Sequence, residues 1–440
     1  MSLGRAVGIF VTSYGVAILG YMALNAFAGR LLGPSEFGYF VAALTLTTTL
    51  GQLGLLGVHR SGLREAARLG QDDVEQLAEL RRGVRATLVI SLPIVGLASA
   101  VVTWFLQSDE DFTTRLLMSV GMAALVILSG QQKVWANYLR GFGHVKFASM
   151  LEGRSGGAMV ATLQAALVGA VWIFFPSWGL AGALLAVAVG YLIPDVVAWR
   201  WVSRTWGHAE GVGVLWHDLR KVARRDWKFA SVQVATMLNS SVEIWIAGLL
   251  LSSSATSMFG AAQRVSMIIV LPMTAIQVVF SPMISRQAIG SDKKPLQNTL
   301  RTGATLASLS TVFLWLPIVL APQLVLQILF GHGFSQAAVP MMLLSTALVV
   351  NAVMGLAGLT LSMGHREGIV ASTQWWTLVV RVVVGSLVAW KFGLVALAVS
   401  SFVWSSVFYV WIWVRARRQM GVNTALTMHP DLRLVREKAN

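Results

Sequence analysis

The sequence has no cysteine and little charge, and each shortage excludes a class of protein. Without cysteine there can be no disulfide frame and no thiolate site. Only 12% of the 440 residues are charged and 56% are apolar, whereas about a quarter of a soluble protein is charged. Two or three soluble domains would fit this length, but so few charges could not cover their surfaces. The composition therefore predicts a chain that is solvated by lipid.

Signals for metal, nucleotide and catalytic sites are also scarce. No histidine pair has zinc-binding spacing on one helix, so no metal site is expected. The motif G-x-x-x-x-G-K-[ST] does not occur, so the chain is not expected to hydrolyse ATP itself. The stretch SDEDF at 108–112 has the D-x-D spacing of metal-diphosphate sites in glycosyltransferases, but no second acidic cluster accompanies it. No cofactor is expected, although H⁺ or Na⁺ coupling is possible.

The sequence has instead a series of long apolar runs. A membrane-spanning helix needs roughly 20 such residues. Twelve segments qualify: 6–29, 37–58, 84–106, 114–138, 147–175, 178–201, 228–251, 257–284, 300–321, 336–361, 367–390 and 393–414. The first is too long for the core of a signal peptide and is taken as a retained helix. The sequence predicts an all-α polytopic membrane protein with 12 transmembrane helices.

Basic residues are distributed unevenly between the connections. When cations near the end of a span are counted with the adjoining connection, the connections after odd-numbered spans carry three Lys or Arg, the other connections and the two termini carry 28, and three lie in the middle of spans. Because cytoplasmic loops are enriched in Lys and Arg, both termini are predicted to be cytoplasmic. The net charge of +15 then follows from topology and attraction to anionic lipid, so no nucleic-acid partner is expected.

Two long connections suggest how the chain is divided. The basic connection at 206–227 separates six spans from six and suits a cytoplasmic interfacial linker. The expected domains are an N-terminal six-helix bundle over 1–205, this linker, a C-terminal six-helix bundle over 228–415, and a basic cytoplasmic tail over 416–440. The tail is expected to lie on the membrane or to be loose. The connection at 59–83 has Leu and Ala at helical spacing and predicts an amphipathic surface helix.

Short motifs recur in the two halves. The matched pairs are Phe37-Gly38 with Phe259-Gly260, Gly143-His144 with Gly364-His365, and Gly179-Leu180 with Gly393-Leu394. Their order is preserved at shifts of 222, 221 and 214 residues, which favours an internal repeat. Each half starts on the cytoplasmic side, so the repeats are parallel about an axis along the membrane normal. Two such bundles can rock about a central cavity, which is typical of a transporter.

The stretch GRLLGPSEFGYF, residues 29–40, separates the first two apolar runs. Gly33-Pro34 is expected to stop one helix and let the next begin, so that the stretch forms the first periplasmic turn. Its Arg30 is one of only three basic residues on that side of the membrane. Arg30 is either a head-group anchor or a rim contact for a departing anionic substrate, and the second interpretation is slightly favoured.

Four of the spans carry a family pattern. The first ends in GRLLGPSEFGYF, the second in LGLLGVHR, the seventh contains LNSSVEIWIAGLL and the eighth opens with MFGAAQRVS. Over essentially its whole length the chain resembles the Wzx-type polysaccharide flippases of the MOP exporter superfamily. The resemblance implies two six-helix bundles in a V-shaped, MATE-like transporter of the bacterial inner membrane.

The resemblance also implies a substrate and partners. The substrate would be undecaprenyl-diphosphate-linked oligosaccharide, moved from the cytoplasmic to the periplasmic leaflet for O-antigen, lipopolysaccharide or exopolysaccharide. Membrane lipids and polysaccharide polymerase machinery are the expected partners. In this family the seventh span usually has an acidic residue where Glu243 stands, and the eighth often has a basic residue where Arg264 stands.

Charged side chains inside spans are candidate functional groups, because burying charge in lipid is costly. Glu243 lies nine residues before position 252, and Arg264 lies eight residues after position 256. They therefore sit at nearly equal depth in adjacent antiparallel spans and could pair. One interpretation is a structural salt bridge. The other is that Glu243 exchanges H⁺ or Na⁺ while the planar fork of Arg264 binds substrate phosphate.

Other polar groups extend this set. Lys133, Asn137 and Arg140 share one helix face. One interpretation is that this face lines the cavity. The other is that the side chains of Lys133 and Arg140 extend toward the lipid head groups. Arg381 lies mid-way through its span and should face protein or water, and the amide of Gln52 should need buried partners. Among the ionisable residues in the middle of spans, three cations outnumber one acid, which favours an anionic substrate. The candidate substrate-binding residues are Arg264, Arg381, Lys133, Arg30 and Asn137, with Glu243 as the candidate for ion coupling.

Three functions remain open at this point. The first is a flippase that works by alternating access. The second keeps the fold but exports another substrate, such as lipid II or cationic small molecules, which the excess of interior cations disfavours. The third is a membrane enzyme, which ranks last because the chain has neither a large periplasmic loop nor an acidic catalytic motif. The chain is therefore not expected to be an enzyme.

Overall fold

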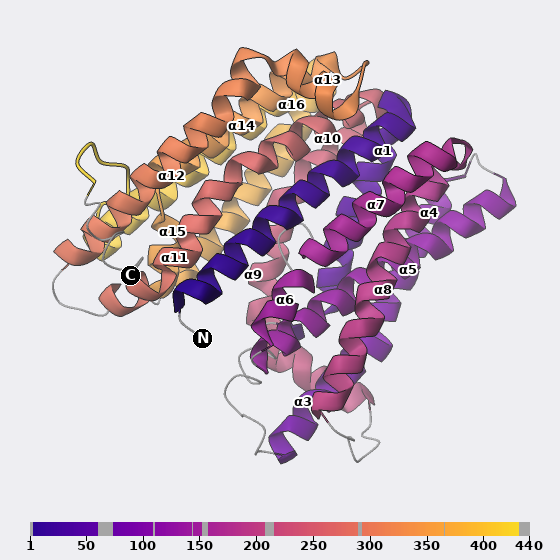
Figure 1. Ribbon diagram of the computed structural model, residues 1–440, viewed down its shortest axis with the longest axis horizontal. Coiled ribbons are helices and arrows are strands. Elements are labelled where there is room, and N and C mark those ends of the chain that lie inside the picture. The colour runs from indigo at the N-terminus through magenta and orange to yellow at the C-terminus, as the bar shows by residue number, and fades with distance from the viewer. Residues whose placement is uncertain are drawn as a thin grey trace. The chain divides into compact units, whose positions relative to one another are not determined.

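The computed structural model shows helices almost throughout (Figure 1). It describes residues 3–59, 74–108, 111–142, 144–151, 157–206, 215–288, 293–364 and 366–430. Within these ranges there is no strand, so the predicted all-α class is confirmed.

The helices of the first half follow the predicted spans, except that the predicted span at 147–175 is divided between α6 and α7. They are α1 (Leu3–Gly54), α3 (Val74–Ala86), α4 (Leu92–Leu106), α5 (Phe112–Gly141), α6 (Val145–Leu151), α7 (Ala158–Phe174) and α8 (Gly179–Trp206). A π-helical turn, η1 (Thr87–Ser91), joins α3 to α4, and a 3-10 turn, η2 (Pro176–Trp178), precedes α8. Of the surface helix predicted at 59–83, residues 60–73 lie outside the described ranges. The remainder is helical from Val74 and continues without a break into the third predicted span.

The second half begins earlier than predicted. Its helices are α9 (Leu215–Leu250), α10 (Ser253–Ser266), α11 (Leu271–Ala288), α12 (Lys294–Leu320), α13 (Pro322–Phe330), α14 (Ala338–Met354), α15 (Ala357–Met363) and α16 (Glu367–Met420), with 3-10 turns η3 (Met267–Val270) and η4 (Ser335–Ala337). Residues 207–214 of the expected linker lie outside the described ranges, and its remainder is the first part of α9. The short α13 lies between the predicted spans 300–321 and 336–361, where no helix was predicted.

Eight described helices are long and apolar enough to cross a membrane, judged by length and composition. Two of these, Thr12–Gly54 and Gly368–Met420, have 43 and 53 residues, whereas one span needs only about 20. Each of the two runs on through an internal break and is counted as one helix, although two spans were predicted in each. The tally of eight therefore does not reproduce the predicted twelve. It does make the protein a multi-pass membrane protein.

Glycine makes both of these breaks. Gly33 has φ 64° and ψ −175°, and Gly393 has φ 76° and ψ −155°. L-residues with a side chain rarely adopt such φ values, whereas glycine does so without steric cost. Pro34 follows the first break, where its fixed φ suits the first turn of the next helix. The predicted break of the helix at Gly33-Pro34 is thus confirmed, whereas its periplasmic position stays a prediction. Gly179, the repeat match of Gly393, also has positive φ.

The chain forms two compact units, each with its own packing. Unit 1 comprises 1–11, 33–39 and 239–440, and unit 2 comprises 12–32 and 40–238. This division differs from the predicted boundaries, because it falls inside α9 and assigns the first turn to unit 1. In unit 1, α12 and α16 both pack on α14, and α11 packs on α12. In unit 2, α5 packs between α4 and α8, and α8 also packs on α7.

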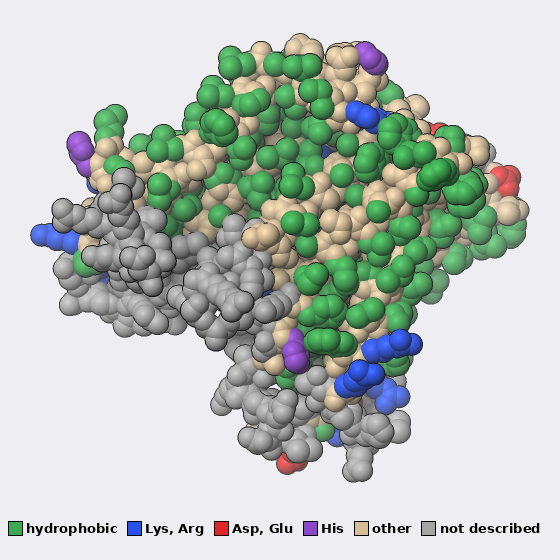
Figure 2. Space-filling view, viewed as in Figure 1, with side chains coloured by type: hydrophobic (Ala, Val, Ile, Leu, Met, Phe, Trp, Pro, Cys, Tyr) green, Lys and Arg blue, Asp and Glu red, His purple; other side chains and the backbone are tan. Residues whose placement is uncertain are grey.

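Large apolar side chains lie on the outside of many helices, as a lipid solvent requires. Phe105 is 70% exposed, Phe313 75% and Trp390 70%. Figure 2 shows hydrophobic side chains over much of the visible face. In water such patches would mark aggregation or binding sites. On these apolar helices they are the lipid-facing surface.

The C-terminal segment (residues 421–430) is packed into unit 1 rather than loose. Val422 and Thr424 are fully buried. The backbone N–H of Leu426 donates to the carbonyl of Val353 at 3.0 Å, and the hydroxyl of Thr424 donates to the carbonyl of Met354 at 2.7 Å. The expectation of a loose or membrane-bound tail is therefore wrong for this segment. Apolar and hydroxyl side chains, rather than basic ones, determine its place. Residues 431–440 lie outside the described ranges.

Candidate functional site

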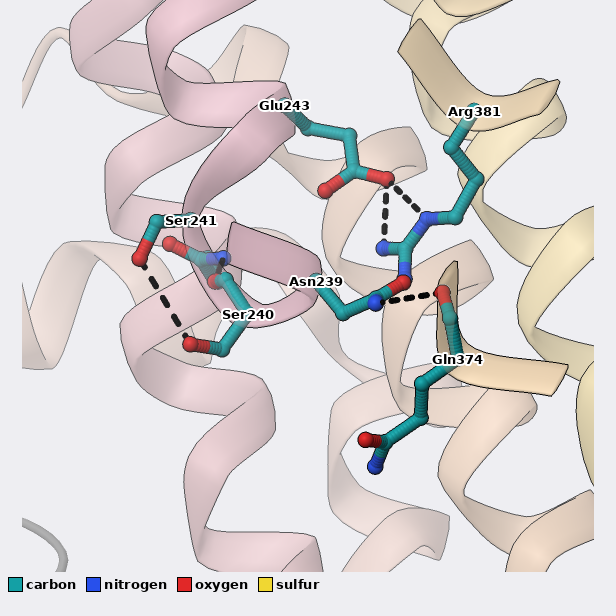
Figure 3. Close-up of polar contacts among 7 residues, drawn as sticks. Asn239, Ser240, Ser241, Glu243, Gln374 and Arg381 are labelled. Atoms are coloured by element: carbon teal, nitrogen blue, oxygen red, sulfur yellow. Dashed lines mark hydrogen bonds and ion pairs between the residues drawn. The ribbon is translucent and has the colours of Figure 1, made fainter. Parts of the chain in front are cut away.

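A buried ion pair in unit 1 joins α9 to α16 (Figure 3). The Nε and Nη2 atoms of Arg381 lie 2.6 and 2.5 Å from Oε1 of Glu243. The side chains are 13% and 4% exposed, respectively. A charged pair taken out of water needs short, hydrogen-bonded contacts to offset its desolvation, and this geometry provides them.

Two amide-bearing residues extend the pair. The Nη1 of Arg381 donates to Oδ1 of Asn239 at 3.3 Å, and Nδ2 of Asn239 donates to the backbone carbonyl of Gln374 at 2.9 Å. Asn239 and Glu243 are four residues apart on α9, so they share one face, and Figure 3 shows both directed toward α16. The guanidinium of Arg381 is thus held by two side chains of the same helix.

The arginine that pairs with the carboxylate of Glu243 differs from the one predicted. Sequence spacing suggested Arg264, but the partner in the structure is Arg381. Arg264 is 6% exposed on α10, where its Nη1 lies 4.0 Å from the sulfur of Met267. Nε2 of the adjacent Gln263 donates to the carbonyl of Ser240 at 3.1 Å. The helix that carries Arg264 thus contacts α9 at Ser240, three residues before Glu243, but within the described structure Arg264 is not the residue that bonds Glu243.

Unit 2 contains the polar face of α5. Asn137 is 4% exposed and its Nδ2 donates to the carbonyl of Lys133, one turn earlier, at 2.8 Å. Lys133 and Arg140 are both half-buried. The amide of Gln132 donates to the carbonyl of Leu151 on α6. These contacts hold α5 locally, and a role of Lys133 and Asn137 in binding substrate stays a prediction.

Arg30 is exposed near the end of the first helix of α1. Its guanidinium carbon lies 5.6 Å from the ring centre of Trp172, within range of a cation–π contact. Trp172 also stacks on Phe27. The structure therefore gives Arg30 an aromatic partner inside unit 2. Neither the anchor nor the rim-contact interpretation is tested by this contact.

The acidic stretch at 108–112 begins a helix. Residues 109–110 lie outside the described ranges, but Asp111 is the N-cap of α5 and accepts hydrogen bonds from the backbone N–H groups of Thr113 and Thr114. Hydrogen bonding from Thr114 lowers the pKa of the Asp111 carboxyl. Among the described residues, no group of three or more His, Cys, Asp or Glu could hold a metal ion.

Sequence reasoning named Gln52 but missed several other polar groups. Nε2 of Gln233 donates to Oε1 of Gln52 at 2.5 Å, so the buried amide has the kind of partner it was expected to need. Asn239 and Gln374 were not singled out. Asn239 carried a signal that could have found it, since it lies one helical turn before an acidic residue in the same apolar run.

Comparisons with known proteins identify the family and the fold of the chain. The profile of the family described as polysaccharide biosynthesis protein matches residues 3–288. The probable low-salt glycan biosynthesis flippase Agl15 of Haloferax volcanii is 20% identical over 413 residues, covering 91% of this chain and 80% of that protein.

Solved structures of MATE transporters share the fold. A MATE in complex with MaL6 has a TM-score of 0.59 at 14% identity and covers 95% of this chain and 96% of its own. An inward-facing multidrug resistance MATE of the MOP superfamily has a TM-score of 0.56 at 16% identity, with 96% and 95% covered. A MOP superfamily transporter from Pyrococcus furiosus, described as having a binding pocket of reverse polarity, has a TM-score of 0.55 at 15% identity, with 95% and 96% covered.

Proposed function

Since this chain belongs to the polysaccharide biosynthesis protein family, we propose that it moves a polyprenyl-diphosphate-linked oligosaccharide across the membrane. The MOP-type transporter fold and the similarity to a glycan biosynthesis flippase support a translocating protein. The proposed carrier lipid is undecaprenyl diphosphate, and the proposed direction is from the cytoplasmic to the periplasmic leaflet of a bacterial inner membrane. Alternating access is the proposed mode of transport.

The observation that carries this proposal is the Glu243–Arg381 ion pair, together with the buried Arg264 on α10, a helix that contacts α9 through Gln263 and Ser240. A guanidinium binds phosphate and carboxylate through the same planar fork of N–H donors. Substrate diphosphate and Glu243 are thus exchangeable partners for Arg381. Arg264 adds a second positive charge. A diphosphate carries more negative charge than a single carboxylate, so it would be attracted more strongly to the two arginines together.

Ion coupling follows from the same exchange. While Glu243 is ionised, its carboxylate balances the positive charge of Arg381, so Arg381 would bind substrate weakly. When Glu243 takes up a proton, the charge of Arg381 loses its counter-ion and the diphosphate becomes the favoured partner. A sodium ion on the carboxylate would release Arg381 in the same way. Loss of the proton or ion would restore the pair and expel the phosphate, so each transport cycle would carry one coupling ion.

The proposed surroundings follow from the substrate. Both termini are proposed to lie in the cytoplasm, where basic connections are enriched. Polysaccharide polymerase machinery would consume the translocated glycan, and membrane lipid would hold the polyprenyl chain throughout.

The test is reconstitution of the full chain in liposomes that contain a fluorescent lipid-linked oligosaccharide. Translocation is read as the fraction of glycan that becomes accessible to a glycosidase on the opposite side. Arg381→Ala is expected to reduce the rate at least tenfold, because charged hydrogen bonds contribute roughly 1.5–3 kcal/mol. Lys391→Ala is the matched control, since it removes an exposed cation from the same helix. Normal translocation by Arg381→Ala would refute the assigned phosphate contact.

The multidrug MATE among the structural neighbours defines the competing outcome. The same liposomes loaded with a cationic dye test it directly. Dye efflux without glycan translocation would replace the proposed substrate by cationic small molecules. Glycan translocation without dye efflux supports the proposal.

A further inference from the structure

A second candidate site lies wholly within unit 2. A cavity of about 580 Å³ is lined by residues of α3, η1, α5 and α8. None of the residues singled out from the sequence as substrate-binding or ion-coupling lines it. Its lining combines charged, aromatic and aliphatic side chains: Arg81, Arg82, Arg85, Asp195, Trp135 and Trp199 among others.

One end of the cavity is cationic. Three arginines come from two successive turns of α3, and they range from the nearly buried Arg81, 8% exposed, to the exposed Arg85. Only one acidic residue, Asp195, faces them from the lining. The balance of two positive charges favours an anionic ligand, and closely spaced guanidinium groups favour phosphate in particular.

The other end of the cavity is apolar and open to the lipid-facing surface. Along the chain from α3 into η1, the lining passes from arginine to Leu88 and Val89, the latter 54% exposed. Along α8 the lining runs the other way, from Leu192, 47% exposed, to Ser203 near the helix end. The two gradients run in opposite chain directions, as expected of antiparallel helices that share one polar end. The cavity is therefore amphipathic along the direction of its helices.

Asp195 supplies a second requirement. It is 3% exposed, and neither carboxylate oxygen has a hydrogen-bond partner among the described residues. A buried polar group without a partner is costly, so a ligand that brings a donor to this carboxylate gains affinity. The ligand should therefore carry a hydroxyl or ammonium group beside its phosphate.

The helix wall beside the cavity is also unusual. Residues Thr87–Ser91 form a π-helical turn, a rare conformation that often marks functional sites. Two hydrogen bonds hold the turn in place: Ser91 Oγ donates to the carbonyl of Gly54 at 2.7 Å, and Thr87 Oγ1 donates to the carbonyl of Gly83 at 2.9 Å. Leu88 and Val89 of this turn are the residues that line the apolar end.

We propose that this cavity binds a membrane lipid by its phosphate-bearing head group. The arginines of α3 hold the phosphate, Asp195 accepts a hydrogen bond from a donor on the head group, and the acyl chains leave past Leu88, Val89 and Leu192. Figure 2 shows Lys and Arg side chains gathered near the end of α8, which suits a position at a head-group layer. This inference does not depend on the proposed transport function.

The test is lipid binding by the purified full chain in detergent, measured by native mass spectrometry. The probes are dioctanoyl phosphatidylethanolamine, dioctanoyl phosphatidylcholine, farnesyl diphosphate and inorganic phosphate. Phosphatidylethanolamine is expected to bind more tightly than phosphatidylcholine, whose ammonium has no N–H, and more tightly than inorganic phosphate. Tighter binding of farnesyl diphosphate would assign the same phosphate chemistry to a polyprenyl source instead. Equal binding of inorganic phosphate would overturn the lipid proposal.

Variants locate the binding. The double variant Arg82→Ala, Arg85→Ala is expected to weaken phosphatidylethanolamine binding at least tenfold, whereas Arg82→Lys, Arg85→Lys should retain most of it. Arg204→Ala removes an arginine from the last turn of α8 that does not line the cavity, and it should have no effect. Asp195→Asn should abolish the preference for phosphatidylethanolamine over phosphatidylcholine. Unchanged binding in the double alanine variant would refute the proposal.

Discussion

The backbone N–H of Gly38 donates a 2.6 Å hydrogen bond to the hydroxyl oxygen of Ser257, 219 residues away. The contact places the start of the second helix of α1 directly on the first turn of α10. Phe37, fully buried beside it, packs its ring 5.3 and 5.7 Å from those of Phe330 and Phe334. All five residues belong to unit 1. The sequence motif Phe37-Gly38, which the sequence matches with Phe259-Gly260, is thus a packing site.

Replacing Gly38 by alanine should destabilise unit 1. A Cβ there would lie 2.7 Å from the backbone carbonyl oxygen of Ser253 and 2.9 Å from the backbone nitrogen of Ser257. Backbone atoms cannot move aside as a flexible side chain can, so overpacking should cost about 1–3 kcal/mol. Thermal unfolding in detergent measures the effect. Gly15→Ala is the control, because a Cβ at Gly15 has no neighbour within 4 Å.

The Glu243–Arg381 pair can be tested for a structural role separately from transport. Glu243→Gln or Arg381→Gln should each lower the free energy of unfolding by about 3–5 kcal/mol, because each leaves one buried charge without its partner. The double variant Glu243→Leu, Arg381→Leu should lose less than either single variant. Denaturant unfolding of the three proteins provides the comparison.

The same double variant separates the two interpretations of the pair. Recovered stability without transport supports a functional pair. Recovery of both stability and transport would show that the pair is only a salt bridge between helices.

Gly33 should not tolerate a side chain, for a reason different from that at Gly38. No atom lies within 4 Å of a Cβ built there, so the cost comes only from its φ of 64°. With its ψ of −175°, Gly33 lies in a backbone region that essentially only glycine adopts, so Gly33→Ala should lower the free energy of unfolding by about 1–3 kcal/mol. Gly368→Ala, at an open position of α16 without positive φ, should be neutral or slightly stabilising. A neutral result at Gly33 would mean that the first turn relaxes at no cost.

The C-terminal segment should contribute to the stability of unit 1. Val422 is fully buried in a cluster with Leu296, Leu300 and Leu356. Val422→Ala should lower the free energy of unfolding by about 1–3 kcal/mol, the cost of the lost methyl groups and the cavity they leave. Met428→Ala, on a side chain that is 90% exposed, is the matched control. Equal stability of the two variants would show that the segment is a passive appendage.

Local chemistry explains what the sequence could predict. The break at Gly33-Pro34 was predictable because a glycine followed by proline acts on its own backbone, whatever surrounds it. The same is true of the helical class, since each apolar run must satisfy its own backbone hydrogen bonds in lipid. The extent of α13 was not predictable, because its nine residues are too few for a span.

The partner of Glu243 depends on tertiary packing, and sequence spacing favoured the wrong cation. Arg264 lies in the next helix along the chain at equal depth, whereas Arg381 is 138 residues away and reaches Glu243 because α16 packs beside α9. Asp195 and the arginines of α3 are likewise separated by more than a hundred residues. A pattern of charges within spans indicates that polar sites exist, but the helix order decides which charges meet.

The discontinuous composition of unit 1 has a consequence for biosynthesis. Synthesis proceeds at roughly 5–20 residues per second, so the 219 residues between Gly38 and Ser257 correspond to about 10–40 s. During that interval the first turn is already made, but its partners Ser257, Phe330 and Phe334 are not. The C-terminal segment joins α12 to α14 only after both have been translated. Residues 33–39 are synthesised early, but unit 1 can be completed only after α10 has been translated. Until then, the insertion machinery or neighbouring helices must hold this first turn.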